Sequence, residues 1–111
     1  MAVFRILEGR ARPGRVDEIA RMFEAQAEAV GGTKGIAFVQ VLRSDDQILG
    51  ISCWKSGEDM QRYLEQDATR EFYSQLPPLL MGTPSIRTYE VVRSIAGNDS
   101  GDPAASAWVH A

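Results

Sequence analysis

The stretch IAFVQVLRSDDQILGISCWK, residues 36–55, decides the fold of this chain. Its two halves, 36–43 and 48–55, are rich in the β-branched and aromatic residues that favour strands. The polar run Ser-Asp-Asp-Gln at 44–47 separates them and is typical of a turn. The stretch therefore predicts a β-hairpin.

Both faces of this hairpin are apolar. Two sets alternate along residues 36–43: Ile36, Phe38 and Leu42 on one face, and Ala37, Val39 and Val41 on the other. An antiparallel sheet with one wet face should instead alternate apolar with polar residues. Helices can cover only one face, so the pattern predicts a homodimer paired through sheet faces. Which face lines the interior stays open, because a one-residue error in register exchanges the two faces.

Strands and a helix are also predicted around the hairpin. Residues 3–9 and 85–92 predict a first and a last strand. An apolar stripe predicts a helix that begins near residue 16 and ends at the glycines 31–32, through Val16, Ile19, Ala20, Phe23, Ala27 and Val30.

Two short helical segments are expected between the hairpin and the last strand. Ser56 with Asp59 predicts a capped start for the first. Asp67 predicts the cap of the second, which Pro77-Pro78 interrupts. The resulting order, β-α-β-β-α-β, is the ferredoxin-like split βαβ plan of an α+β domain with a four-stranded antiparallel sheet.

Length and composition limit the classes of function. A chain of 111 residues has one core, predicted over 1–93, followed by a small polar tail, 94–111, whose Trp108 we expect to dock on the domain or on a partner. Net charge is -3 and the basic residues are scattered, which argues against nucleic acid or an anionic membrane as partner. With a single cysteine, Cys53, no intrachain disulfide can form, and no apolar run reaches the ~20 residues of a membrane span. We expect a cytoplasmic protein.

Several segments together resemble the antibiotic biosynthesis monooxygenase family. They are RILEGRARPG at 5–14, DE at 17–18, ISCWKS at 51–56, YL at 63–64 and RTYEVV at 87–92. The resemblance implies a dimeric α+β barrel, in which two ferredoxin-like sheets pack face to face. Some members oxygenate anthrone-like polyketides with O2 and no cofactor, others degrade haem, and others act on quinols or autoinducer-like molecules.

The haem-degrading branch has an Asn, a Trp and a His at positions that match Leu7, Tyr63 and Tyr73 here, so all three depart from its pattern. The sole histidine, His110, lies in the tail. Haem binding through a Tyr73 phenolate remains an alternative. The reading that we favour uses neither cofactor nor metal.

Cofactor-free oxygenation needs a dry pocket, an orienting hydrogen bond and stabilisation of a substrate anion. Tyr63 and Tyr73 are the candidate catalytic hydrogen-bonders, and Arg5 or Arg87 could stabilise an oxyanion. The candidate aromatic walls of the substrate pocket are Phe23, Phe38, Trp54 and Phe72. We therefore predict a monooxygenase that acts on a small aromatic or quinol-like substrate.

Each of these residues also has a structural interpretation. Trp54 is more often a packing residue at a strand end, and Phe23 and Phe72 on their helical stripes are more often plain core. Arg87 can form an ion pair with Glu90, and Glu8 can pair with an arginine at an interface. If these interpretations hold, the chain is a non-catalytic ligand-binding or assembly module of the same fold.

Overall fold

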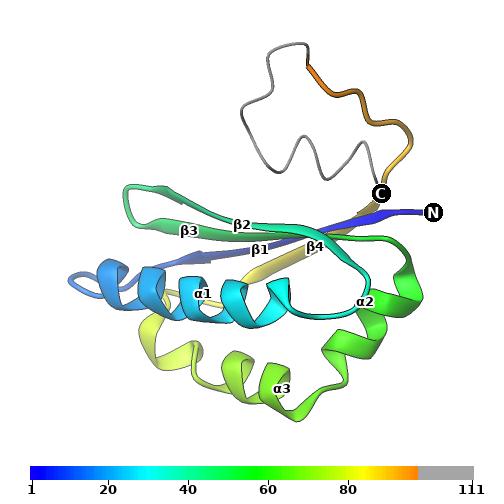
Figure 1. Ribbon diagram of the computed structural model, residues 1–111. Coiled ribbons are helices and arrows are strands. Elements are labelled where there is room, and N and C mark those ends of the chain that lie inside the picture. The colour runs from blue at the N-terminus through cyan, green and yellow to red at the C-terminus, as the bar shows by residue number, and fades with distance from the viewer. Residues whose placement is uncertain (98–111) are drawn as a thin grey trace.

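A four-stranded antiparallel sheet with helices on one face forms the protein in this computed structural model, which describes residues 1–97 (Figure 1). The sheet order is β2-β3-β1-β4. The strands are β1 (Val3–Arg10), β2 (Ile36–Ser44), β3 (Gln47–Trp54) and β4 (Ser85–Glu90). The helices are α1 (Val16–Gly31), α2 (Gly57–Leu64), α3 (Asp67–Ser74) and a 3₁₀ turn, Pro77–Leu79. The predicted α+β, ferredoxin-like plan is confirmed.

The helices attach to the sheet largely as their sequences predict. The buried stripe of α1 contains Ile19, Phe23 and Val30. Ser56 caps α2, because its Oγ accepts a hydrogen bond from the backbone N–H of Asp59 at 3.2 Å. The predicted cap of α3 is wrong by one residue: Gln66 is the N-cap, and Asp67 is the first helical residue. There the Asp67 carboxylate still faces the positive end of the helix dipole.

A β-bulge in β2 decides which side chains face the helices. Ile36 pairs with Trp54 but Phe38 pairs with Cys53, so one extra residue, Ala37, interrupts the alternation. Ile36 packs with Trp54 beneath the helices. After the bulge Val39 takes the helix-covered face, and Phe38 turns to the opposite one.

The opposite face of the sheet, which we call the open face, carries no helix of the described residues. The Phe4 and Phe38 rings meet edge to face on it, with centroids 6.2 Å apart. Leu42 and Tyr89 are 43% and 49% exposed. The helix-covered face instead holds fully buried side chains such as Trp54. Both faces of the sheet are thus apolar, but the helices of the described residues cover only one of them.

No helix within residues 1–97 is long and apolar enough to cross a membrane. The predicted tail, with Trp108 and His110, lies mostly outside the described residues, so its docking stays a prediction.

Candidate functional site

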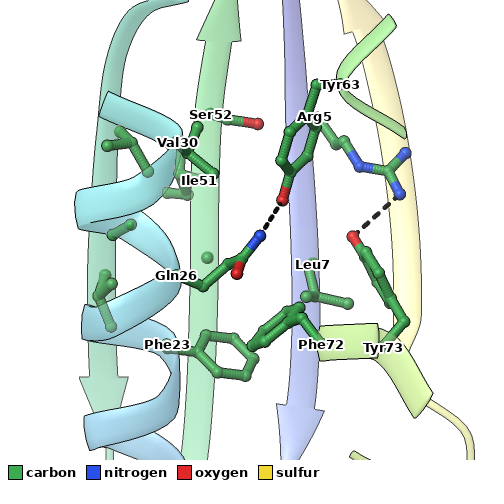
Figure 2. A pocket seen from close by; sticks show the side chains of 14 residues that line it. Arg5, Leu7, Phe23, Gln26, Val30, Ile51, Ser52, Tyr63, Phe72 and Tyr73 are labelled. Carbon is green, nitrogen blue, oxygen red and sulfur yellow. Dashed lines mark hydrogen bonds between the residues drawn. The ribbon is translucent and has the colours of Figure 1, made fainter. Parts of the chain in front are cut away.

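A cavity lies between the helix-covered face of the sheet and the helices (Figure 2). Its volume is about 50 Å³. We call it the inner cavity. Strand residues form its floor, and side chains from three helices form its walls. The residues that matter most for its chemistry are Arg5, Leu7, Phe23, Gln26, Gly50, Ser52, Tyr63, Phe72 and Tyr73.

Tyr63, on α2, is fixed on two sides. Its ring stacks on Trp54, with centroids 5.1 Å apart and planes 27° from parallel. Trp54 is itself held in place, because its indole N–H donates to Ser52 Oγ at 2.9 Å. Gln26 Nε2 donates to the Tyr63 hydroxyl oxygen at 2.8 Å. Burial raises the pKa of Tyr63, so its hydroxyl remains protonated at neutral pH.

Tyr73, on α3, is half-buried and lies beside a cation. Arg5 Nη2 donates to the Tyr73 hydroxyl oxygen at 3.1 Å, and the Arg5 guanidinium carbon lies 6.0 Å from the centre of the ring. Phe72 contacts the Tyr73 ring edge to face at 5.4 Å. Arg5 therefore places a positive charge next to the Tyr73 hydroxyl group.

The two tyrosine hydroxyl groups take the same part in hydrogen bonding. Each oxygen accepts a hydrogen bond, one from Gln26 and the other from Arg5. A phenol has a single hydrogen to donate, and each of these hydrogens is left for another acceptor. Figure 2 shows both hydroxyl groups within the site, approached from opposite sides by their donors. The site is therefore suited to a ligand that presents acceptor or anionic oxygens.

The structure brings some of the predicted site residues together and separates others. Tyr63, Tyr73, Phe23 and Phe72 line the inner cavity, together with Arg5. Trp54 is absent from the lining and supports Tyr63 from behind.

Phe38 and Arg87 do not line this cavity. The bulge at Ala37 turns Phe38 to the open face, where it packs with Phe4. Arg87 pairs with Ile6 in the sheet register and lies on the same face, where its Nη2 is 3.7 Å from Glu8 Oε2. The ion pair suggested with Glu90 is thus replaced by one with Glu8.

The sequence interpretation missed Gln26. It lies three residues after Phe23 and four before Val30, both of which are buried on α1. A single amide within an apolar helical stripe must find a partner, since an unpaired buried polar group is costly. That interruption of the stripe was the signal available in the sequence.

The size of the inner cavity limits what it holds in this state. A cavity of about 50 Å³ accommodates water, whereas ~150 Å³ is the size of an engineered cavity that binds benzene. An aromatic ligand therefore requires some lining side chains to move.

Comparison with known proteins identifies the fold to which this chain is similar. No protein-family model matches the sequence, and no curated protein matches it. Among solved structures, Rv0793 from Mycobacterium tuberculosis is similar with a TM-score of 0.79 and 11% identity, over 86% of this chain and 100% of that one. A proposed antibiotic biosynthesis monooxygenase from Deinococcus radiodurans has a TM-score of 0.76 and 16% identity, over 86% and 96% of the two chains. The chain has the antibiotic biosynthesis monooxygenase fold.

A third similar structure of this fold has a described activity. It is a variant of SnoaB, a cofactor-independent oxygenase from Streptomyces nogalater, with a TM-score of 0.75 and 18% identity, over 85% of this chain and 96% of SnoaB. The TM-scores establish the antibiotic biosynthesis monooxygenase-like fold, as the resemblance predicted. Because the identities are low, the chemistry has to be argued from the residues of this chain.

Proposed function

We propose that this protein is a cytoplasmic, homodimeric, cofactor-independent monooxygenase that acts with O2 on a small aromatic or quinol-like molecule. One observation carries the proposal: two tyrosine hydroxyl groups in a largely apolar cavity have oxygens that already accept hydrogen bonds from Gln26 and Arg5. Both hydroxyl groups can then donate to the oxygen of a substrate anion. The similarity to a cofactor-independent oxygenase supports the same reaction class.

The chemistry follows from what such an anion does. An anthrone-like substrate loses a proton to water, and the Tyr63, Tyr73 and Arg5 donors stabilise the resulting anion. Tyr63 acts as a donor and not as the base, because its raised pKa keeps it protonated. The anion passes one electron to O2, and the radical pair combines to form a C–O bond. The resulting peroxide anion takes up a proton, and the hydroperoxide loses water as its C–H and O–O bonds break, which leaves a ketone. In total, one CH₂ group and one O2 give one C=O group and one water.

The open face supports the dimer. It presents Phe4, Phe38 and the exposed Leu42 and Tyr89 side by side, whereas exposed apolar patches of this kind usually mark association sites. A second sheet is a cover of matching shape, because two sheets pack face to face about 10 Å apart. The same Glu8–Arg87 pair on each protomer would lie at this interface.

The test is O2 uptake by the metal-stripped protein with a panel of anthrones and hydroquinones, after subtraction of spontaneous oxidation. We expect uptake that falls by about 100-fold in the double variant Tyr63→Phe, Tyr73→Phe. Tyr89→Phe is the matched control, because Tyr89 lies on the open face, and it should retain activity. Uptake that survives in the double variant would overturn the assignment of the two tyrosines.

The small inner cavity favours a second candidate, a non-catalytic module with the same fold. In that case the protein would bind no member of the panel, and titration calorimetry would show no heat with any of them. Binding without O2 uptake would instead indicate a ligand-binding module.

A further inference from the structure

A groove runs between α1 and α3 on the outer surface of the helical layer. Its volume is about 250 Å³. The residues that define it are Ala25 and Gln26 on α1, with Ala68, Glu71, Phe72 and Gln75 on or next to α3. Gln26 and Phe72 line both the groove and the inner cavity. These two side chains therefore lie at the boundary between the two spaces.

This partition is built from side chains that can rotate. The side-chain amide of Gln26 donates a hydrogen bond across the cavity to the Tyr63 hydroxyl oxygen, at 2.8 Å. Phe72 packs by edge-to-face contacts against Phe23 and Tyr73, with centroids 5.6 and 5.4 Å away. Rotamer changes of such side chains need no movement of the backbone.

The combined volume of the inner cavity and the groove favours a single ligand site that includes both. The inner cavity of about 50 Å³ is too small for a ring, but adding the groove of about 250 Å³ brings the space to the lower end of the ~300–1,000 Å³ of small-molecule sites. The alanines at 25 and 68 keep the groove open at its outer end.

The two compartments differ in charge. Arg5 is the charged residue that lines the inner cavity, whereas Glu71 is the charged residue that lines the groove, within the described part of the chain. We propose that the α1–α3 groove is the entrance and outer subsite of the ligand site. The oxygen-bearing ring passes Gln26 and Phe72 into the inner cavity, and a neutral or cationic substituent remains in the groove beside Glu71. The substrate named in this inference rests on the proposed function, but the experiment that tests the route does not.

The route is tested by thiol labelling, which requires no turnover. Ser52→Cys places a thiol in the inner cavity with little change in volume. The native Cys53 gives a low background, because it is buried and burial raises its pKa to about 11. We expect methyl methanethiosulfonate to label the cavity thiol about tenfold more slowly when Ala68→Trp or Ala25→Trp fills the groove.

Ala29→Trp is the matched control, since Ala29 is exposed on α1 and does not line the groove. It should leave the labelling rate unchanged. The two groove variants lie on different helices, so one remains informative if the other fails to fold. Equal labelling rates in all three tryptophan variants would overturn the route.

The charge preference is tested with two further reagents on the same thiol. The ratio of the rates with aminoethyl and sulfonatoethyl methanethiosulfonate should fall by about threefold or more in Glu71→Gln, as expected when one exposed unit charge is removed at short range. A ratio that Glu71→Gln does not change would overturn the outer subsite. Absence of O2 uptake with these labelling results would overturn the proposed function and leave the groove in place.

Discussion

The two faces of the sheet carry similar apolar residues but have different roles. On the helix-covered face Trp54 is fully buried, and Phe23 of α1, which packs over this face, is almost fully buried. The Tyr63 hydroxyl group and the Trp54 indole N–H there each have a hydrogen-bonding partner. On the open face Leu42 and Tyr89 remain about half exposed, and a Glu8–Arg87 ion pair lies among them. The covered face encloses a small space with oriented donors, whereas the open face has the composition of an interface. The difference lies in what covers each face, not in hydrophobicity.

The largest expected effect comes from truncating a ring of α1 that packs over the covered face. Phe23→Ala should lower the free energy of unfolding by about 3–5 kcal/mol, because it leaves a cavity among buried side chains. Urea titration at two protein concentrations measures this. The loss should be the same at both, whereas Phe38→Ala on the open face should cost stability that depends on concentration through the dimer. Equal and concentration-independent losses would remove the distinction between the faces.

The next effect concerns association. Phe38→Asp buries a carboxylate in the proposed interface, so it should weaken the dimer by at least about tenfold, or 1.4 kcal/mol. Light scattering should give about twice the 12.2 kDa chain mass for the unmodified protein and a monomer for the variant. Ala29→Asp on α1 serves as the control and should remain dimeric. A wild-type monomer at micromolar concentration would contradict the dimer.

A smaller effect is expected in the floor of the inner cavity. A Cβ at Gly50 would lie 3.4 Å from Phe23 Cδ2, which is ordinary contact. Gly50→Ala should therefore raise the free energy of unfolding by about 0.5–1 kcal/mol, as expected for a glycine replaced within a strand. The same methyl group narrows the cavity, so ligand affinity should fall as stability rises. Thermal melts and titration of the best substrate measure the two changes. A fall in stability would show that Phe23 cannot accommodate the methyl group.

The last effect, which is negligible at neutral pH, is a dependence of stability on alkaline pH. Burial raises the pKa of the Cys53 thiol from 9.0 to about 11, so the unfolded chain loses this proton first as the pH rises. Stability is complete below pH 9 and falls as the pH approaches 11. Cys53→Ala should remove part of the loss between pH 9.0 and about pH 11 in urea titrations, and the raised pKa of Tyr63 should account for a remaining part. An unchanged slope in Cys53→Ala would contradict this account of the thiol.

Periodicity and turn signals were enough to predict most of the fold. The hairpin, the α1 stripe, the Ser56 cap and the two apolar faces all follow from residue types at fixed spacing. Local signals of this kind do not show which residues of neighbouring strands pair with each other. The extra residue at Ala37 therefore moved Phe38 away from the site to which its spacing had assigned it.

The candidate site was predictable only in part, for the same reason. Tyr63 and Tyr73 were found as hydrogen-bonding residues on helices, and the structure gathers them at one cavity. Their partners were not assigned to them, because Gln26 and Arg5 lie 37 and 68 residues away in the sequence. Only the tertiary arrangement brings donors and hydroxyl groups together and so gives both tyrosines the same polarity.

The bulge in β2 has a consequence for solubility in a crowded cell. β2 is an edge strand of the sheet, and edge strands offer unpaired backbone groups to strands of other molecules. An irregular step at Ala37 breaks the flat run of donors and acceptors on which cross-molecule strand pairing depends. The residue that redirects Phe38 toward a face-to-face partner thus also discourages the growth of the sheet from its edge into a fibre.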